Sequence, residues 1–148
     1  MKKSCLLLGI GVVLGGLVAT ATAADTTAAA CPVSGKPVQQ TATATHHGGT
    51  VYFCCKKCQK AFKDDASKFA SKANQQLVVT GQASQEKCPI SGGKTKSGTE
   101  FKIGNTEVAF CCKNCRKKVA EASSSDRVDL VFGDQPFGKG FVVHGDSE

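Results

Sequence analysis

The cysteines of this chain are the residues whose type and spacing could do chemistry. In the first half, 22 residues separate Cys31 from Cys54, and three residues separate Cys54 from Cys58. Thiolates are soft metal ligands, and a metal site needs several of them brought together from distant points of the chain. The same two intervals recur at a constant offset of 57 residues, with Cys88, Cys111 and Cys115. The spacing therefore predicts two metal sites with three cysteine ligands each.

A further cysteine follows the second thiol of each set, Cys55 in the first half and Cys112 in the second. Each completes a Cys-x-x-Cys sequence, which is also typical of thioredoxin-like redox proteins. No βαβ pattern surrounds either copy, so the sequence favours auxiliary metal ligands over redox catalysis. Disulfide pairing, across the halves or within one, is the alternative that an exported chain leaves open, and the protein would then be a disulfide-stapled extracytoplasmic interaction domain.

The elements around the first cysteine set must bring its thiols together. Residues 31–35, Cys-Pro-Val-Ser-Gly, predict a tight turn, because proline fixes one φ and glycine permits a positive one. Residues 38–45 and 50–54 predict a hairpin with its turn at 46–49. From Lys56 the apolar positions follow a helical period that we expect to end at Asn74. Positions 54 and 58 then face the same way at the positive end of a helix, which lowers thiol pKa.

The second half predicts the same order of elements: a turn at 88–93, a hairpin over 99–103 and 106–110, and a helix over 113–122 ended by the serines at 123–125. Short strands are predicted at 77–79, 128–132 and 141–143, and the last two are expected to pair as a C-terminal hairpin. The fold class is therefore α+β, with two small repeated modules and a C-terminal β-hairpin.

The N-terminus predicts export. A basic start at Lys2 and Lys3, an apolar run and Ala21-Thr22-Ala23 are typical of a signal peptide over residues 1–23. The apolar run is short and contains glycines, which disfavours a permanent membrane anchor. We expect a periplasmic or secreted protein with no stable membrane insertion after cleavage. A tether at 24–30, a first module at 31–81, a linker at 82–87 and a second module at 88–148 would follow.

The net charge of the full chain is +7, and 17 basic against 12 acidic residues remain without Lys2 and Lys3. An exported protein rarely meets nucleic acid, so we interpret this charge as solvated lysine faces that also support thiolates. The sequence contains no Ser/His/Asp arrangement or glycine-rich phosphate loop that would indicate an enzyme. We therefore expect no catalytic activity.

Both halves resemble the TRASH or YHS family of metal-binding domains. The resemblance rests on Cys-Pro-x-x-Gly at 31–35 and 88–92, on Phe-Cys-Cys at 53–55 and 110–112, and on Cys58, Phe62 and Cys115. It covers about 70 residues and leaves the C-terminal segment unexplained. The resemblance implies a treble-clef-like fold that binds, senses or delivers a heavy-metal ion, with a metal-transport or metal-enzyme protein as the partner.

The chain departs from the family pattern in the opening turn, where Ser34 and Ser91 stand in place of a second cysteine. A fourth ligand is therefore open between Cys55 or Cys112, water and, in the first half, His46 or His47. Ile103 stands at the position equivalent to His46, so histidine ligation cannot serve both halves. Three thiolates suit Cu⁺ directly, whereas Zn²⁺ prefers a fourth donor. The sequence leaves both ions as candidates.

Overall fold

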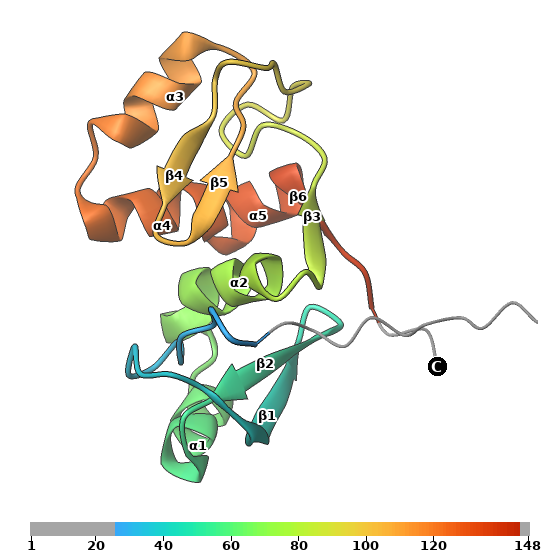
Figure 1. Ribbon diagram of the computed structural model, residues 1–148, viewed down its shortest axis with the longest axis vertical. Coiled ribbons are helices and arrows are strands. Elements are labelled where there is room, and N and C mark those ends of the chain that lie inside the picture. Colours follow the sequence, from blue (N-terminus) through green and yellow to red (C-terminus); the bar gives the residue numbers. More distant parts are fainter. Residues whose placement is uncertain (1–25, 146–148) are drawn as a thin grey trace, which may run out of the picture.

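The computed structural model describes residues 26–145, so the predicted signal peptide lies outside the described residues. Figure 1 shows two lobes stacked along the long axis, with helix α2 (Ala70–Val79) lying between them. Each lobe holds one hairpin and one helix that follows the hairpin. Residues 26–145 form a small α+β fold, as predicted, with three separate two-stranded antiparallel sheets.

The first lobe is built on the hairpin of β1 (Gln39–His46) and β2 (Gly49–Phe53). Its two-residue turn has positive φ at both central positions, 50° at His47 and 84° at Gly48, which suits the right-handed twist of the strands. Helix α1 (Lys56–Asp64) starts where the sequence predicted, and buries Phe62 against Phe53. The predicted first hairpin and the start of its helix are confirmed.

The predicted end of this helix is wrong. Helix α1 ends at Asp64. A short 3-10 helix, η1 (Ser67–Phe69), follows, and α2 then runs through Asn74 to Val79. Residues 77–79, predicted as a strand, are therefore helical. The reason is tertiary: Ala73 and Leu77 are fully buried on one face of α2, and this burial outweighs the strand preference of Val78 and Val79.

The second lobe contains the hairpin of β4 (Phe101–Ile103) and β5 (Thr106–Val108), followed by α3 (Lys113–Ala120). Its strands are shorter than predicted. Two more helices, α4 (Ser124–Phe132) and α5 (Asp134–Gly140), then pack beneath the hairpin. The strand predicted at 128–132 is wrong, because Ser123 accepts a hydrogen bond from the Asp126 amide and caps the start of α4.

The strand predicted at 141–143 is confirmed as β6 (Phe141–Val143), but its predicted partner is wrong. It pairs antiparallel with β3 (Ala83–Gln85), which lies within the segment predicted as a linker. The fold therefore has no C-terminal hairpin within residues 26–145. Instead, the C-terminal strand returns to the segment that joins the two lobes.

Three glutamine side chains each bond to both backbone groups of one residue in or directly after a strand. Gln76 accepts from the Tyr52 amide and donates to the Tyr52 carbonyl, and Gln82 does the same at Thr50. Gln85 forms the equivalent pair with Ala109. These side chains satisfy backbone groups that a hairpin edge would otherwise leave unpaired.

The two lobes share one hydrophobic core. Phe53 and Leu77 belong to the same buried cluster as Phe110 and Phe132, and all four are fully buried. Cys31 and Cys88 also belong to this cluster, which ties the predicted ligands to the packing of the whole chain. No helix within residues 26–145 is long and apolar enough to cross a bilayer.

Candidate metal centres

The structure brings the three predicted cysteines of the first half together. Cys31 lies in the opening turn, Cys54 directly follows β2, and Cys58 lies in the first turn of α1. Their sulfur atoms all lie within 4.8 Å of one another, and the Sγ atoms of Cys54 and Cys58 are 3.6 Å apart. The opening turn is closed by the Gly35 amide donating to the Cys31 carbonyl, and Gly35 has the positive φ expected of it, 72°.

The second half repeats this geometry. Cys88, Cys111 and Cys115 also have their sulfur atoms within 4.8 Å of one another, and Cys111 and Cys115 Sγ are again 3.6 Å apart. We call the two groups the first and second thiol triads. Each could hold one soft metal ion between a buried turn cysteine and two half-buried cysteines.

A serine hydroxyl lies within hydrogen-bond distance of one sulfur of each triad. Ser34 Oγ lies 3.2 Å from Cys54 Sγ, and Ser91 Oγ lies 3.1 Å from Cys111 Sγ. These are the positions where the sequence lacks a second turn cysteine. A neutral hydroxyl is a weak ligand, so it stabilises a thiolate by hydrogen bonding more than it completes a tetrahedral site.

The turn cysteines have lower pKa values than the helix cysteines of their triads. Burial raises the pKa of Cys31, but hydrogen bonds from Ser34 and from the backbone of Cys54, Ser34 and Val33 outweigh burial and lower the pKa to about 7. Burial and equivalent hydrogen bonds from Ser91 and Cys111 leave Cys88 with a pKa of about 7 as well. Each triad therefore holds a thiolate close to neutral pH, which is the form that binds metal.

The helix cysteines behave in the opposite way. Burial, together with hydrogen bonds to neighbouring thiols, raises the pKa of Cys58 to about 12, and Cys115 reaches about 12 for the same reasons. The Cys58 and Cys115 thiols therefore stay protonated at neutral pH. A bound cation would displace these protons, so metal binding and proton release are linked.

Cys55 and Cys112 lie at the rim of the triads. Cys55 is exposed, and its Sγ is 3.8 Å from that of Cys54; the corresponding distance from Cys112 to Cys111 is 3.7 Å. Hydrogen bonds from the backbone and side chain of Cys58 lower the pKa of Cys55, and the Cys115 backbone is the main cause of the same shift in Cys112. All eight cysteines within residues 26–145 are free thiols.

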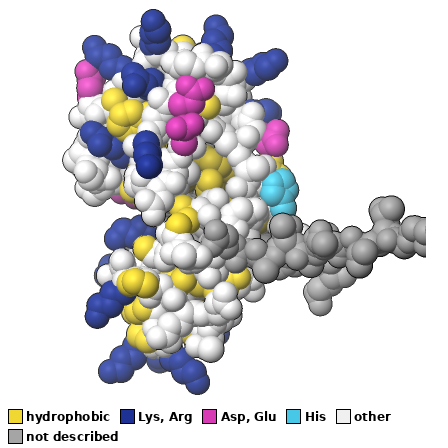
Figure 2. Space-filling view, viewed as in Figure 1, with side chains coloured by type: hydrophobic (Ala, Val, Ile, Leu, Met, Phe, Trp, Pro, Cys, Tyr) yellow, Lys and Arg dark blue, Asp and Glu magenta, His cyan; other side chains and the backbone are white. Residues whose placement is uncertain are grey.

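Lysine and arginine side chains surround both triads. The exposed residues of α1 include Lys56, Lys57 and Lys60, and α3 carries Lys113, Arg116 and Lys117 in the equivalent places. In the space-filling view, dark-blue side chains gather at the two ends of the long axis (Figure 2), where Figure 1 places α1 and α3. These cations lie on the exposed faces of the two helices that carry Cys58 and Cys115.

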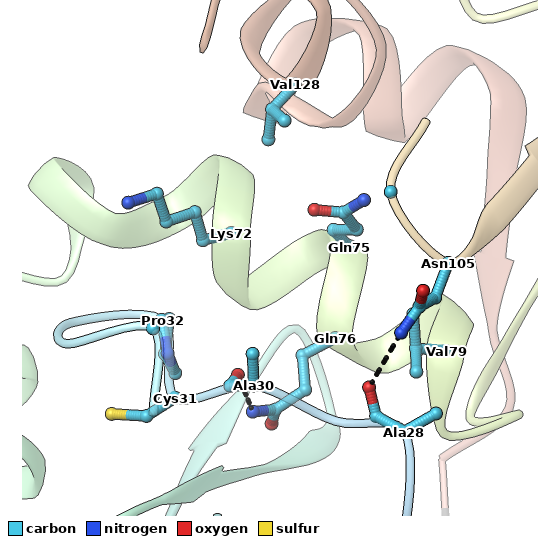
Figure 3. Close-up of a pocket in the computed structure, with 12 residues that line it drawn as sticks. Ala28, Ala30, Cys31, Pro32, Lys72, Gln75, Gln76, Val79, Asn105 and Val128 are labelled. Atoms are coloured by element: carbon cyan, nitrogen blue, oxygen red, sulfur yellow. Dashed lines mark hydrogen bonds between the residues drawn. The ribbon is translucent and has the colours of Figure 1, made fainter. Parts of the chain in front are cut away.

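A pocket of about 300 Å³ lies along α2 between the lobes. It is lined by the amide side chains of Gln75, Gln76 and Asn105 and by Lys72, with Cys31 at one edge. Figure 3 shows the Cys31 sulfur pointing away from Gln75 and Asn105. The pocket therefore adjoins the first triad without exposing its thiol to the cavity.

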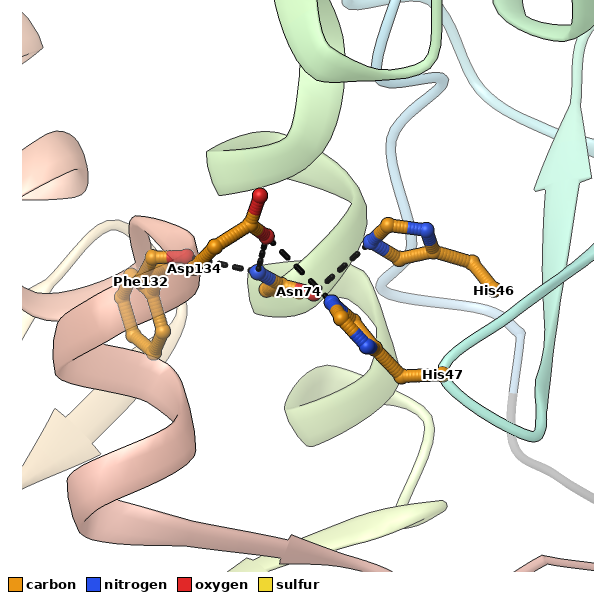
Figure 4. A network of polar contacts seen from close by, with 5 residues as sticks. All are labelled: His46, His47, Asn74, Phe132 and Asp134. Carbon is orange, nitrogen blue, oxygen red and sulfur yellow. Dashed lines mark hydrogen bonds and ion pairs between the residues drawn. The ribbon is translucent and has the colours of Figure 1, made fainter.

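The structure places His46 and His47 with Asp134, and the first triad contains cysteines alone. The ligand atoms of His46, His47 and Asp134 all lie within 4.8 Å of one another, around the buried side chain of Asn74 (Figure 4). Sequence reasoning missed Asp134 and Asn74. The only signal was local: Gly133-Asp134-Gln135-Pro136 is typical of a helix start, which is where Asp134 lies.

No protein-family model, curated protein or solved structure matches this chain. What the molecule itself presents is two triads of cysteines, each positioned as a possible metal site. The resemblance to the TRASH or YHS family thus rests on the residues of the sequence.

Proposed function

We propose that this protein is an exported, non-enzymatic metal-binding protein that scavenges or delivers a thiophilic metal ion as its cargo. The observation that carries the proposal is the duplicated thiol triad: six cysteines from two distant segments of each half converge in two groups of three. This arrangement supports the interpretation as a tandem TRASH- or YHS-type protein. Three thiolates with a neighbouring serine hydroxyl in place of a fourth thiolate favour Cu⁺ over Zn²⁺, because Cu⁺ accepts three-coordinate thiolate sites.

The rim cysteines support delivery over permanent storage. The rim cysteine sulfurs lie 3.8 and 3.7 Å from a triad sulfur, so a rim thiol can replace a triad thiolate on the ion. A thiol of a partner protein can then replace the rim cysteine. In this exchange one metal–sulfur bond forms as another breaks, and the ion keeps its oxidation state. Cys55 is exposed and has a lowered pKa, as such a thiol requires.

The metal content of purified protein tests the assignment. Under anaerobic, reducing conditions, native mass spectrometry after Cu⁺ loading should show two ions per chain. Cys54→Ser should remove one ion and leave the second triad loaded, and Cys111→Ser should do the reverse. Full metal content in either variant would overturn the ligand assignment.

Cys55→Ser is the matched control, because it changes a neighbouring thiol outside the triad. It should keep both ions and slow the transfer of the first-triad ion to a thiol-containing acceptor. If the loaded protein instead reduces a model disulfide at a rate that Cys55→Ala and Cys112→Ala abolish, the protein is a thiol oxidoreductase and the proposal is wrong.

A further inference from the structure

His46, His47 and Asp134 converge from segments that lie far apart in the sequence. His46 ends β1, His47 forms the hairpin turn of the first lobe, and Asp134 is the first residue of α5 in the second lobe. His47 Nε2 lies 3.3 Å from Asp134 Oδ1, across 87 residues of chain. The three ligand atoms lie within 4.8 Å of one another and come from both lobes.

Asn74 holds this group in place from beneath. Its side chain is fully buried, and its amide nitrogen donates to the Phe132 carbonyl at 2.9 Å and to Asp134 Oδ1 at 3.1 Å. These two bonds fix the amide orientation, so Asn74 Oδ1 points toward His46 Nε2, 2.9 Å away. Two imidazole nitrogens, a carboxylate oxygen and an amide oxygen therefore face a common centre (Figure 4).

The separations within this group fit a small cation. Metal–ligand bonds to histidine nitrogen and carboxylate oxygen are about 2.0–2.2 Å, so adjacent ligands of one ion lie roughly 3–3.5 Å apart. The two measured contacts between proposed ligand atoms, His46 Nε2 to Asn74 Oδ1 at 2.9 Å and His47 Nε2 to Asp134 Oδ1 at 3.3 Å, fall at or close to this range. Each neutral imidazole would move its proton from Nε2 to Nδ1 to present a lone pair, which needs no net proton loss.

The backbone at His47 is an independent indication. Its φ of 50° makes it the one non-glycine residue in the left-handed region within residues 26–145. Two-residue hairpin turns of this kind prefer asparagine, aspartate or glycine at that position. A histidine held in this conformation costs free energy, and such strain clusters at functional sites. The turn directs this imidazole toward Asp134.

We propose that His46, His47 and Asp134, together with the Asn74 amide oxygen, form a third metal site that binds a divalent first-row transition-metal ion. Nitrogen and oxygen ligands favour Cu²⁺, Ni²⁺ or Zn²⁺ and select against the soft monovalent ions that suit the thiol triads. The protein would thus hold two chemically different kinds of site. Because the ligands come from both lobes, an ion at this site also ties the lobes together.

Ni²⁺ binding to untagged protein tests this site independently of the thiols. The thiols are first saturated with Ag⁺, and Ni²⁺ is then titrated by calorimetry and by NMR of the imidazole resonances. One equivalent of Ni²⁺ should bind, with the strongest paramagnetic effects on the His46 and His47 imidazole signals and weaker ones on His144. The remaining histidine, His144, bonds to Ser84 and lies outside the group.

His47→Gln and Asp134→Asn should each weaken Ni²⁺ binding at least tenfold, and the matched control His144→Gln should not change it. Both His47 and Asp134 have about half of their side chains exposed, 45% and 56%, so these variants keep the core packing. Ni²⁺ should also raise the melting temperature of the wild type and of His144→Gln, but not of His47→Gln.

Absence of a Ni²⁺ equivalent in the wild type, or equal binding by all variants, would overturn the proposal. Variants that lower the melting temperature while the Ni²⁺ response persists would also overturn it, since the group would then be only a hydrogen-bond network. The result is independent of the thiol triads, which remain blocked throughout.

Discussion

At the scale of single residues, the serines in the opening turns decide the character of the thiol triads. Ser34 and Ser91 bring a hydroxyl, rather than a fourth thiolate, within 3.2 and 3.1 Å of a triad sulfur. They help to lower the pKa of the buried turn cysteines without offering the ion a fourth strong ligand. Each triad therefore contains a turn cysteine with a lowered pKa and offers an ion three thiol ligands rather than four.

Metal affinity should fall as the pH is lowered. Cys31 and Cys88 are thiolates above a pKa of about 7 and become protonated below it, so protons compete with the ion. Above pH 7, the affinity should still rise with pH, because the ion must displace the proton of Cys58, whose pKa is about 12. Competition with a chelator, corrected for its own protonation, measures this; equal affinity at about pH 6 and about pH 8 would contradict it.

Ser34→Cys should convert the first triad into a four-thiolate site. Zn²⁺ prefers four tetrahedral ligands, so its affinity for this site should rise roughly tenfold or more, about 1.4 kcal/mol. Ser34→Ala is the matched control, since it removes the hydroxyl without adding a donor. Zn²⁺ titration against a competing chelator distinguishes them, and equal affinity in both variants would show that position 34 does not face the ion.

At the scale of elements, α2 organises the first lobe and its contact with the second. Gln76 on this helix bonds to both backbone groups of Tyr52, and Asn74 reaches the carbonyl of Phe132 in α4. Leu77 packs beside Gly49, the first residue of β2, which also lies against Val143 of β6. Hairpin, helix and C-terminal strand meet at this glycine.

Gly49→Ala should destabilise the protein by about 1–3 kcal/mol, the usual cost of overpacking a filled site. A Cβ atom there would lie 2.7 Å from Leu77 Cδ2 and 3.3 Å from Val143 Cγ1. Gly138→Ala is the control, because its Cβ would meet nothing within 4 Å and α5 gains from alanine. Denaturant unfolding measures both, and similar stability of the two variants would contradict the packing argument.

The elements that carry the cysteines could be predicted from the sequence, because their signals are local. The Cys-Pro-x-x-Gly turns, the hairpin with His47 and Gly48 at its tip, and the helix starting at Lys56 each follow from turn chemistry or periodicity. Residues 77–79 and 128–132 could not be predicted in this way. Their valine-rich composition indicates strands. Burial of Leu77, Val131 and Phe132 in the shared core favours helices instead, and the Ser123 cap adds to this in α4.

At the scale of the whole molecule, the two thiol triads are anchored in one core. The turn cysteines are almost completely buried, with 1% of Cys31 and none of Cys88 exposed, while the partner cysteines reach toward the surface. The convergence of each triad could be predicted from spacing. The group of His46, His47 and Asp134 could not be predicted from spacing, because Asp134 meets the histidines only through the packing of α5 against the first lobe.

Metal removal should lower the stability of the whole chain. Removing an ion leaves buried thiols that must share protons or carry charge, and the binding free energy no longer supports the fold. A strong chelator under reducing conditions should therefore lower the melting temperature by more than about 5 °C. Calorimetry or circular dichroism measures the change, and coincident melting curves with and without metal would contradict it.

The pairing of β3 with β6 has a consequence for how the chain matures. Ser84 and His144 form a hydrogen bond across 60 residues, and β3 can pair only after β6, the last strand, has been synthesised. During synthesis from the N-terminus, the first triad is complete long before that strand emerges. All three cysteines of the first triad are thus already synthesised while the strand that joins the C-terminal segment to β3 is still missing.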